Sequence, residues 1–480
     1  MADATPLSFA DGQASGIEEL TGATPMSINM LVDAGGALIT RPGLSAWEDW
    51  ACPALNDAGA GAVIGAWVWQ SPSGDRLVYV TADRRIWAMI SANNRVALSD
   101  ATAATQLDGA LRPTFVSTKT RVVIAGGGVP QKWEGAGLSA RLGGSPPAAS
   151  HIVANSSRLV ASAPTVGGFE FWSKTGDTPG HETWDTGLDF AEAEARPDVI
   201  LATHENSNEV YAFGTETLQL FIPDGSTVYA PGRASNFGCK AAYSVIPLGD
   251  NGFALLADEQ GPVFAITGGR SVTPISIPSM TKTIKRFATL ADCWGFRVQL
   301  EGWDLAVWTF PTEGRTLVFD SGTKQWSEWR GFDGTDWTEW AGQSHAYWAA
   351  KELHLVGMPD GTIAKLDPDS FQDAGVDLRG LVRTGFQGDD SLKTCERLAL
   401  TLRRGEASDA EPLVSVSWRD GLGSFAQPLK IGLGLSGDDA ITVRKWALGT
   451  FRKRQWQMEF SANSRLVLAS AGLLTVAEGL

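Results

Sequence analysis

Several carboxylate side chains in the central part of the chain could, as a pair, serve as the acid and the base of a glycoside hydrolase. The candidates are Asp258, Glu259, Asp304, Asp320, Asp333, Asp336 and Glu339. Most of them stand in turn-forming stretches such as DSG and FDGTD, where an Asp side chain accepts hydrogen bonds from its own turn. We therefore interpret these carboxylates as turn residues and predict no catalytic pair.

Histidine and cysteine, the usual ligands of zinc, are few and widely spaced. The chain has 5 His, and neither His181 nor His204 has a second His three or four residues away. The four cysteines are Cys52, Cys239, Cys293 and Cys395. None belongs to a C-x-x-C pair, which favours buried free thiols over a zinc site or a disulfide framework. Since a phosphate-binding G-x-x-x-x-G-K-[ST] stretch is also missing, the sequence predicts no catalytic residue, no metal, no cofactor and no enzyme activity.

Aromatic rings offer a third kind of chemistry, because the chain has 19 Trp. The stretch QWSEWRGFDGTDWTEWAG, residues 325–342, holds four of them and could be a platform for a sugar or a packing element. Four tryptophans each close the second strand of a repeated unit: Trp87, Trp133, Trp172 and Trp326. A ring that recurs at one place in successive units predicts packing between neighbouring sheets.

That explanation does not cover Trp329, Trp337 and Trp340. For these three, two interpretations stay open: a hairpin packed on the sixth unit, or an interface with another subunit. The alternative from a different functional class is a carbohydrate-active propeller, a hydrolase or a lectin, with Trp337 and Trp340 as its platform.

The formal net charge of −15 argues against a protein whose main task is to hold nucleic acid by its phosphates. The one compact basic run is FRKR, which contains Arg452, Lys453 and Arg454. We interpret it as a solvated strand edge or a subunit contact. The longest apolar stretch, residues 58–69, is too short and too rich in glycine to span a bilayer, and the start of the chain does not resemble a secretory signal. We expect a protein that is made in the cytoplasm and does not insert into a membrane.

Strand patterns recur at intervals along the chain, whereas helical periodicity is confined to short stretches such as 279–293. Units that begin at residues 76, 121, 158, 209, 252, 305 and 353 each show an alternating apolar strand, a turn and a second strand. Their spacing is close to the roughly 40–50 residues of a four-stranded propeller blade. The sequence therefore predicts an all-β fold with a β-propeller of about seven blades over residues 51–375.

The two ends of the chain have other patterns. Residues 1–50 show little periodicity and are predicted to form an N-terminal extended arm. After residue 375 the strands become longer, and in LVSVSW and QWQMEF apolar residues alternate with polar ones. Period two with one apolar face predicts a half-buried antiparallel sheet. We expect residues 376–480 to form a separate β-sandwich-like module.

The stretch NMLVDAGGALITRPGL, residues 29–44, resembles the entry segment of the packaged-DNA-stabilisation proteins of short-tailed phages, also called tail hub or nozzle proteins. The positions that fit its N-M-(x)n-L-R-x-x-P-G passage are Asn29, Met30, Leu38, Arg41, Pro42 and Gly43. Further stretches come in the family's order, among them NEVYAFGTETLQLFIPDG, LVFDSGTKQWSEW and KWALGTFRKRQWQMEF. The resemblance covers residues 29–476, although the many tryptophans and the DWTEW hairpin depart from the family pattern.

The resemblance implies a non-enzymatic virion protein that forms a homohexameric ring below the portal and its adaptor. Such a ring would extend the DNA exit channel, help to retain packaged DNA and anchor tail fibres or tailspikes. Double-stranded DNA would pass through the lumen without specific binding, along a wall that we expect to be acidic. A bacterial scaffold propeller without a virion role is a further possibility.

We expect the arm and the C-terminal module to contact neighbouring subunits and the adaptor. Pro fixes its own φ and Gly adopts turn conformations that other residues avoid, so Arg41, Pro42 and Gly43 are predicted to set a turn that leads the arm into the first blade. The predicted contact residues are Arg41, Pro42, Trp329, Trp337, Trp340, Arg452, Lys453 and Arg454.

Overall fold

The structure is a computed structural model. It describes residues 5–7, 26–48, 61–100, 102–163, 167–193, 198–224, 228–249, 252–258, 262–268, 271–407, 412–433 and 440–477. Strands dominate these residues. The single α-helix among them, α1, runs only from Pro278 to Ile284, so Phe287 and Leu290 of the longer predicted helix lie beyond its end. No described helix is long and apolar enough to cross a membrane.

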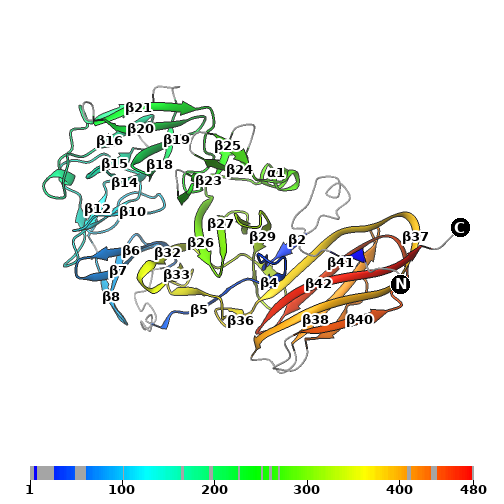
Figure 1. The fold of residues 1–480 in the computed structure, drawn as a ribbon. Helices are drawn as coiled ribbons and strands as arrows, with labels where there is room; N and C mark the ends of the chain where they lie inside the picture. The colour runs from blue at the N-terminus through cyan, green and yellow to red at the C-terminus, as the bar shows by residue number, and fades with distance from the viewer. Residues whose placement is uncertain are drawn as a thin grey trace.

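Five antiparallel four-stranded sheets come one after another along the chain, in a ring that fills the left of Figure 1. The first holds β6 (Val63–Ser71), β7 (Gly74–Thr81), β8 (Ile86–Ser91) and β9 (Asn94–Ala97). The second holds β10 (Thr114–Ser117), β11 (Val122–Ala125), β12 (Gln131–Trp133) and β13 (Ala140–Arg141). The third holds β14 (His151–Asn155), β15 (Arg158–Ser162), β16 (Phe169–Trp172) and β17 (Phe190–Glu192).

The fourth sheet holds β18 (Ile200–Asn206), β19 (Glu209–Gly214), β20 (Leu218–Asp224) and β21 (Val228–Ser235). The fifth holds β22 (Ile246–Gly249), β23 (Gly252–Asp258), β24 (Pro262–Gly268) and β25 (Val272–Pro274). A last propeller sheet is built from β32 (Ser344–Trp348), β33 (Leu353–Gly357), β34 (Ile363–Asp367) and β5 (Gly43–Ala46), with the short β35 (Gln372–Asp373) and β36 (Val376–Asp377) beyond β5. The propeller is thus closed by a strand from near the N-terminus.

Between the fifth and the last of these sheets lie β26 (Trp294–Leu300), β27 (Trp303–Phe310), β28 (Arg315–Asp320) and β29 (Trp326–Trp329). They form an antiparallel quartet, but β29 pairs onward through β2 (Met26–Ile28) with the C-terminal sheet. Counted as separate sheets, the propeller has six blades where the sequence predicted about seven. The difference is this quartet, whose hydrogen bonding makes it part of a 14-stranded sheet.

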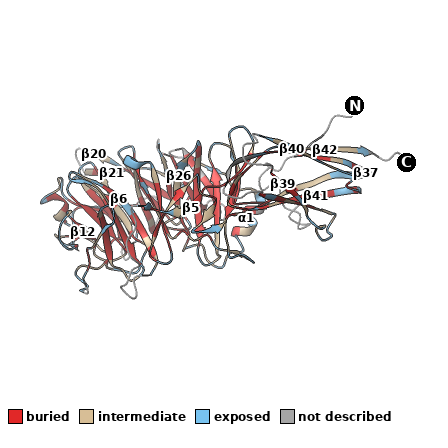
Figure 2. Ribbon diagram, turned by 90° about the horizontal axis from the view of Figure 1, so that it is seen from below, coloured by how far each residue is buried: buried red, intermediate tan, exposed pale blue. Residues whose placement is uncertain are grey.

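Continuous apolar runs form the middle strands of the propeller sheets, because each sheet is covered on both faces by its neighbours. In β7, the residues from Leu77 to Val80 are all completely buried. Side chains from adjacent sheets share each core: Trp69 and Val78 of the first sheet pack with Ile124 and Trp133 of the second. Figure 2 shows buried residues in the interior of the propeller and also in the C-terminal strands.

The four recurring tryptophans lie in these cores, as their repetition predicted. Each is at most 4% exposed and packs with residues of a neighbouring sheet: Trp87, Trp133, Trp172 and Trp326. An aromatic ring is large enough to fill the widening gap between two stacked blades, which explains its recurrence.

The C-terminal residues form long strands that extend to the right of Figure 1. They are β37 (Arg379–Ala407), β38 (Leu413–Asp420), β39 (Leu429–Gly432), β40 (Ile441–Trp446), β41 (Thr450–Ser461) and β42 (Ser464–Ala477). The first half of β37 pairs with β41 and its second half pairs with β42 and β40. Residues 376–480, for which the sequence predicted a β-sandwich-like module, thus contribute to one hydrogen-bonded sheet whose two halves share a single core.

The apolar residues that alternate with polar ones in the C-terminal strands are buried, as the sequence predicted. Val414, Val416, Trp456, Met458 and Phe460 are each at most 2% exposed and belong to the same core. Residues from both halves of β37 join this cluster. The two halves of the sheet therefore pack against each other by burying apolar surface in this shared core.

The N-terminal segment is not an arm that stands apart from the other modules. Besides β2 and β5 it contributes β1 (Thr5–Pro6), β3 (Met30–Val32) and β4 (Leu38–Thr40); β1 and β4 both pair with β42. The described strands within residues 1–50 are therefore shared between the C-terminal sheet and the propeller. The predicted R-P-G turn leads into β5 of the last propeller sheet and not into the first blade, because β5 pairs with β34.

Closure of the ring depends on the absence of a side chain at Gly43. A Cβ added there would lie 2.4 Å from the backbone oxygen of Gln372 and 2.7 Å from that of Ser370. We expect Gly43→Ala to lower the free energy of unfolding by about 1–3 kcal/mol, because a backbone must shift to admit the methyl group. The urea midpoint, monitored by tryptophan fluorescence, measures this effect.

Gly187→Ala is the matched control, since its added Cβ would meet nothing closer than 3.5 Å. Equal midpoints for the two variants would show that the close approach of β5 to β35 contributes nothing to closure.

Candidate functional site at the junction of the propeller and the C-terminal sheet

Asn29 and Arg41 stand where the N-terminal segment, the propeller and the C-terminal sheet meet. Strand β2 inserts between β29 of the propeller and β37 of the C-terminal sheet, with Ile28 opposite both Glu328 and Leu381. The chain then reverses at Asn29, which has a φ of 56°. Asn tolerates this left-handed conformation better than most residues. One short segment therefore joins two large modules through backbone pairing.

Arg41 is completely buried and holds this junction through its guanidinium group. Its Nη1 and Nη2 donate to the two carboxylate oxygens of Asp373 at 3.1 and 2.5 Å. Its Nε donates to Oδ1 of Asn29 at 2.9 Å, and Nη1 also donates to the Pro42 carbonyl at 2.8 Å. The planar fork of arginine suits such paired contacts with a carboxylate, which lysine could not reproduce.

The Asn29 side chain completes the network. Its Nδ2 donates to the Arg330 carbonyl at 2.9 Å and to the Arg379 carbonyl at 2.8 Å. The Arg330 amide donates in turn to Oδ1 of Asn29 at 2.9 Å. One amide side chain thus connects the end of β29 with the start of β37.

Two of the unexplained tryptophans lie directly against this network. The Arg41 guanidinium lies 5.4 Å from the centre of the Trp329 ring, and Trp329 contacts Trp340 edge to face with ring centres 5.4 Å apart. Trp329 is completely buried and Trp340 is 1% exposed. Of the two open interpretations of these tryptophans, packing within the chain is the one that the structure supports.

The third tryptophan, Trp337, lies on a small hairpin made of β30 (Gly331–Phe332) and β31 (Trp337–Thr338). Its ring contacts Phe332, with centres 5.8 Å apart, and the Arg379 guanidinium, 5.2 Å away. Trp337 is half-buried, so part of its ring stays accessible. The hairpin covers the first residue of β37 and thereby shields the junction.

The basic residues of the run FRKR also differ in burial. Arg454 is buried, donates to both carboxylate oxygens of Asp420 at 2.6 and 2.9 Å, and donates to the Leu448 carbonyl at 2.6 Å. Arg452 and Lys453 are exposed, and the Lys453 ammonium lies 3.2 Å from Oδ1 of Asp390.

The predicted contact residues must therefore be corrected. Five of the eight are buried inside this chain and cannot offer their side chains to a neighbour: Arg41, Pro42, Trp329, Trp340 and Arg454. Trp337, Arg452 and Lys453 remain accessible. A basic or aromatic residue in a short motif can serve either role, and only its burial distinguishes them.

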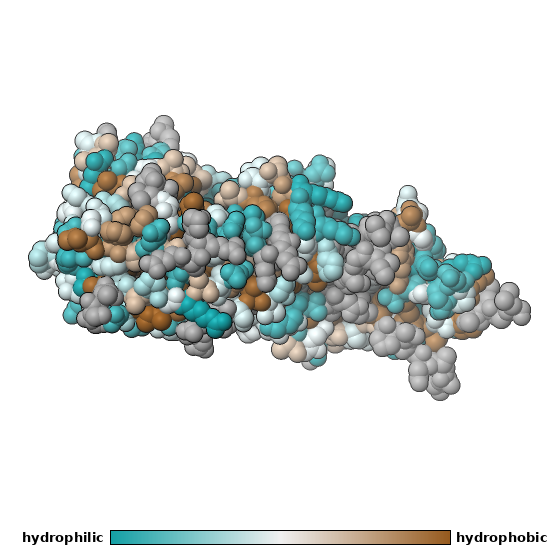
Figure 3. All heavy atoms as spheres, turned by 90° about the horizontal axis from the view of Figure 1, so that it is seen from above, coloured by the Kyte–Doolittle hydropathy of each residue, from teal (hydrophilic) through white to brown (hydrophobic). Residues whose placement is uncertain are grey.

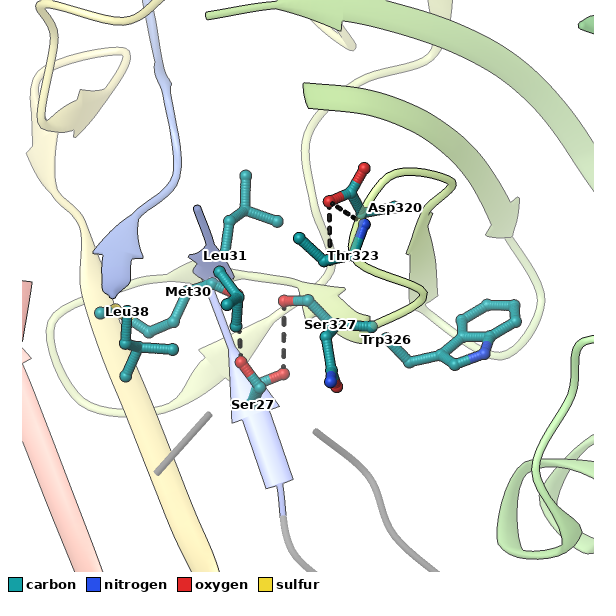
Figure 4. Close-up of a pocket in the computed structure, with 10 residues that line it drawn as sticks. Ser27, Met30, Leu31, Leu38, Asp320, Thr323, Trp326 and Ser327 are labelled. Atoms are coloured by element: carbon teal, nitrogen blue, oxygen red, sulfur yellow. Dashed lines mark hydrogen bonds between the residues drawn. The ribbon is translucent and has the colours of Figure 1, made fainter. Parts of the chain in front are cut away.

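A narrow crevice lies beside the junction, between the N-terminal strands and the turn after β28. Figure 4 shows Leu31 and Leu38 on one side and Asp320 and Trp326 on the other. Its volume is about 10 Å³, which is enough for one water molecule at most. The Ser327 hydroxyl donates to the Ser27 carbonyl across it at 3.5 Å. The crevice is thus a packing seam and not a ligand pocket.

Turn hydrogen bonds or ion pairs hold several of the carboxylates that were weighed as acid and base. Asp320 accepts hydrogen bonds from the amide of Gly322 and the hydroxyl of Thr323, and Asp333 accepts from the amides of Thr335 and Asp336. Asp304 lies in an ion pair with Arg297 at 2.6 Å. Glu259 falls outside the described residues. In the described ranges, no group of three or more His, Cys, Asp and Glu side chains could hold a metal ion.

Glu170 on β16 has the most strongly raised carboxyl pKa of the described chain. Burial raises its pKa to about 8, although the hydrogen bond donated by the Thr203 hydroxyl acts in the opposite direction. A raised carboxyl pKa is typical of catalytic acids. Glu170 is completely buried, however, so no substrate can reach it. It is a neutral packing residue between the third and fourth sheets.

The central residues of the junction were only partly foreseen. The R-P-G motif drew attention to Arg41, but its partner Asp373 lies 332 positions away in a stretch with ordinary turn character. Asn29 belonged to the longer passage of residues 29–44 that resembles the family, without any predicted role. Only the meeting of β2, β29 and β37 reveals why an amide is needed at that position.

We expect Arg41→Met to destabilise the protein by about 3–5 kcal/mol, because it leaves Asp373 and Asn29 without their buried partner. Urea unfolding and limited proteolysis between the propeller and the C-terminal sheet would detect the loss. The control is Arg465→Met, which removes a partly exposed ion pair with Glu301 and should cost no more than about 1 kcal/mol. Similar losses in both variants would contradict the central role of Arg41.

Glu170→Gln should make stability less dependent on pH. In the wild type the folded pKa of Glu170 is raised, so its contribution to stability is complete below the unfolded pKa and is lost as pH rises toward about 8. The free energy of unfolding of the variant should therefore increase relative to that of the wild type as pH rises from about 5 to about 8. Urea midpoints across this range test the prediction, with the exposed Glu192→Gln as control. A constant difference at all pH values would refute it.

Comparisons with known proteins found a family match for part of the chain. Residues 180–370 match the family model described as "Bacteriophage P22 Gp10, beta-propeller". None of the curated proteins matches the chain. Among solved structures, "YCF48 bound to D1 peptide" is 10% identical with a TM-score of 0.40, and covers 68% of this chain and 99% of its own. The extracellular domain of BT4673 from B. thetaiotaomicron is 8% identical with a TM-score of 0.43, and covers 80% of this chain and 46% of its own.

The family match agrees with the resemblance seen in the sequence. It includes the fourth and fifth sheets, the quartet β26–β29, most of the last propeller sheet and the tryptophan-rich hairpin. At a coarse level, this part of the chain is similar to a β-propeller family of phage proteins.

Proposed function

We propose that this protein is a non-enzymatic structural component of a short-tailed phage tail. It would assemble as a homohexameric ring below the portal and adaptor, extend the DNA exit channel, help to retain packaged DNA and anchor fibres or spikes. The match of residues 180–370 to the phage tail propeller family carries this proposal. The finer details rest on the resemblance of the sequence motifs and on the rigidity and charge of the subunit.

Rigid coupling between the modules favours a role in assembly. A ring subunit must hold its contact surfaces at fixed positions, since each loose joint adds an entropic cost to association. Here the propeller and the C-terminal sheet are joined by backbone pairing through β2 and by the buried Arg41 network. The subunit is therefore suited to act as one block.

Charge is distributed unevenly between the modules. Residues 1–375 contain 25 Lys and Arg against 42 Asp and Glu, whereas residues 376–480 contain 14 against 12. An acidic propeller and a slightly basic C-terminal sheet favour a head-to-tail contact, in which the basic edge of one subunit meets the acidic surface of the next. Such heterologous contacts generate closed rings when the rotation between subunits allows it.

The outer surface agrees with polar, charge-guided contacts. On the face in Figure 3, hydrophobic residues occur in small groups scattered among hydrophilic ones. Electrostatic attraction between charged surfaces of two subunits sets their orientation and association rate more than their final affinity. It is also weakened by salt, because charges on an exposed surface are screened over about 10 Å at 0.1 M.

The carbohydrate-active alternative receives less support. A sugar platform made of Trp337 and Trp340 needs two accessible rings, but Trp340 is buried against Trp329 and Phe296. Trp337 alone is accessible, and the Arg379 guanidinium already lies over its ring. Glycan-array binding that is lost in Trp337→Ala would nevertheless overturn the structural role.

Assembly of the purified chain tests the proposal. We expect mass photometry and negative-stain images to give sixfold rings at low salt. In Arg452→Glu with Lys453→Glu, two exposed positive charges become negative. We expect this double variant to form rings only at a protein concentration at least tenfold higher than the wild type needs, which corresponds to a loss of about 1.4 kcal/mol or more in association free energy.

Lys119→Glu with Lys285→Glu is the control, since it makes the same charge change at exposed positions of the propeller. Monomers under all conditions would exclude self-assembly of the isolated chain. Rings that are equally stable in both double variants would exclude the basic C-terminal edge as the contact.

A further inference from the structure

Two histidines of the last propeller sheet form a hydrogen-bonded pair that the proposed function does not use. His345 lies on β32 and His354 on the adjacent antiparallel strand β33. Nε2 of His345 lies 2.9 Å from Nδ1 of His354, and the two rings are stacked with centres 5.2 Å apart. His354 is buried and His345 is half-buried. The pair is therefore a direct contact between two imidazoles that water reaches only in part.

The pair lies on the seam where the last sheet packs against β26 of the neighbouring quartet. Nε2 of His354 lies 3.0 Å from the carbonyl oxygen of Gln299, and the ring of His345 stacks on Phe296 with centres 4.5 Å apart. Both of these partners belong to β26. Phe296 also stacks on Trp340, one of the rings beside the junction network. While the seam is closed, these contacts hold the two imidazoles against each other.

The same contacts fix the positions of the ring protons. A carbonyl oxygen can only accept, so His354 carries its proton on Nε2 and donates it to Gln299. Nδ1 of the neutral His354 ring is then an acceptor, and it receives the proton on Nε2 of His345. One further proton can bind Nδ1 of His345 without breaking either hydrogen bond.

A second added proton has no place on the closed pair. Two protonated imidazoles carry a proton on every ring nitrogen, so the N–H of His345 would point at the N–H of His354 across 2.9 Å. The closed pair therefore accepts at most one added proton. In contact with water, each imidazole has a pKa near 6.5, and both rings become charged in acid.

The surroundings of the pair offer no counter-charge to a protonated ring. Within the described ranges, neither imidazole has an ion-pair partner, and the ring beside His354 is that of Tyr347, 4.7 Å away. The charged residues of β26 and of the ends of the seam have other contacts: Arg297 with Asp304, Glu301 with Arg465, and Arg112 over the ring of Trp294. Burial lowers the pKa of His354, although its hydrogen bond to the Gln299 carbonyl acts in the opposite direction. Burial and the neighbouring His354 lower the pKa of His345.

We propose that the hydrogen-bonded pair of His345 and His354 is an acid-sensitive switch on the seam between β26 and the last propeller sheet. Above about pH 6.5 the neutral pair keeps the seam closed, and its contribution to closure is complete. At lower pH the open seam binds two protons and the closed seam at most one. Opening therefore takes up at least one proton, so its equilibrium constant rises about tenfold or more for each pH unit below about 6.5. The inference does not depend on the proposed tail function.

Hydrogen exchange of the full chain tests the switch, with exchange rates corrected for the intrinsic effect of pH. Between about pH 7.5 and about pH 5.0, we expect the amides of β26, β32 and β33 to lose about tenfold or more of their protection. The amides of β7 and β11, in the first two sheets, should change much less. Most carboxylates keep their charge in this range, so histidines dominate the response.

His345→Gln with His354→Gln removes both titratable rings but keeps side chains that can donate hydrogen bonds, so it should abolish the acid response of the seam. His204→Gln, at a histidine of β18 in the fourth sheet, is the control and should leave that response unchanged. An acid response of equal size in the double variant, or protection lost equally in all propeller sheets, would overturn the switch. If the double variant does not fold, the exchange pattern of the wild type decides, because a local switch and general acid unfolding give different patterns.

Discussion

The buried contact between Arg41, Asn29 and Asp373 is the constraint on which the arrangement of the molecule depends. Arg41 and Asn29 come from the N-terminal segment, Asp373 from the edge of the last propeller sheet, and the carbonyls that Asn29 binds from the ends of two modules. A charge without water must have all its partners in place, so the network forms only when all three parts are assembled. Propeller closure and module docking are thereby coupled.

The same contact explains why several surface candidates proved to be internal. Trp329 lies against the Arg41 guanidinium and packs on Trp340, and both rings are buried. A low local dielectric of this kind strengthens the electrostatic interactions of a buried network. The accessible residues that remain, Trp337, Arg452 and Lys453, border the C-terminal strands rather than the propeller core. The proposed role in assembly would require this separation between a buried internal network and an exposed edge.

The axis of the propeller is also occupied rather than open. Arg112 reaches across it to Trp294 and the Gln343 carbonyl, so a DNA channel of the proposed ring would lie between subunits and not through each propeller.

The sequence by itself determined the repeated strands, the positions of Trp87, Trp133, Trp172 and Trp326 between sheets, and the alternation in the C-terminal strands, because these result from local periodicity and from burial of large rings. The tertiary structure alone decided that β5 closes the last sheet, that β37 serves two halves of one core, and which residues of R-P-G, DWTEW and FRKR are buried. Pairings such as Arg41 with Asp373 join positions hundreds of residues apart, and no local pattern encodes which distant strand edge will meet a given side chain.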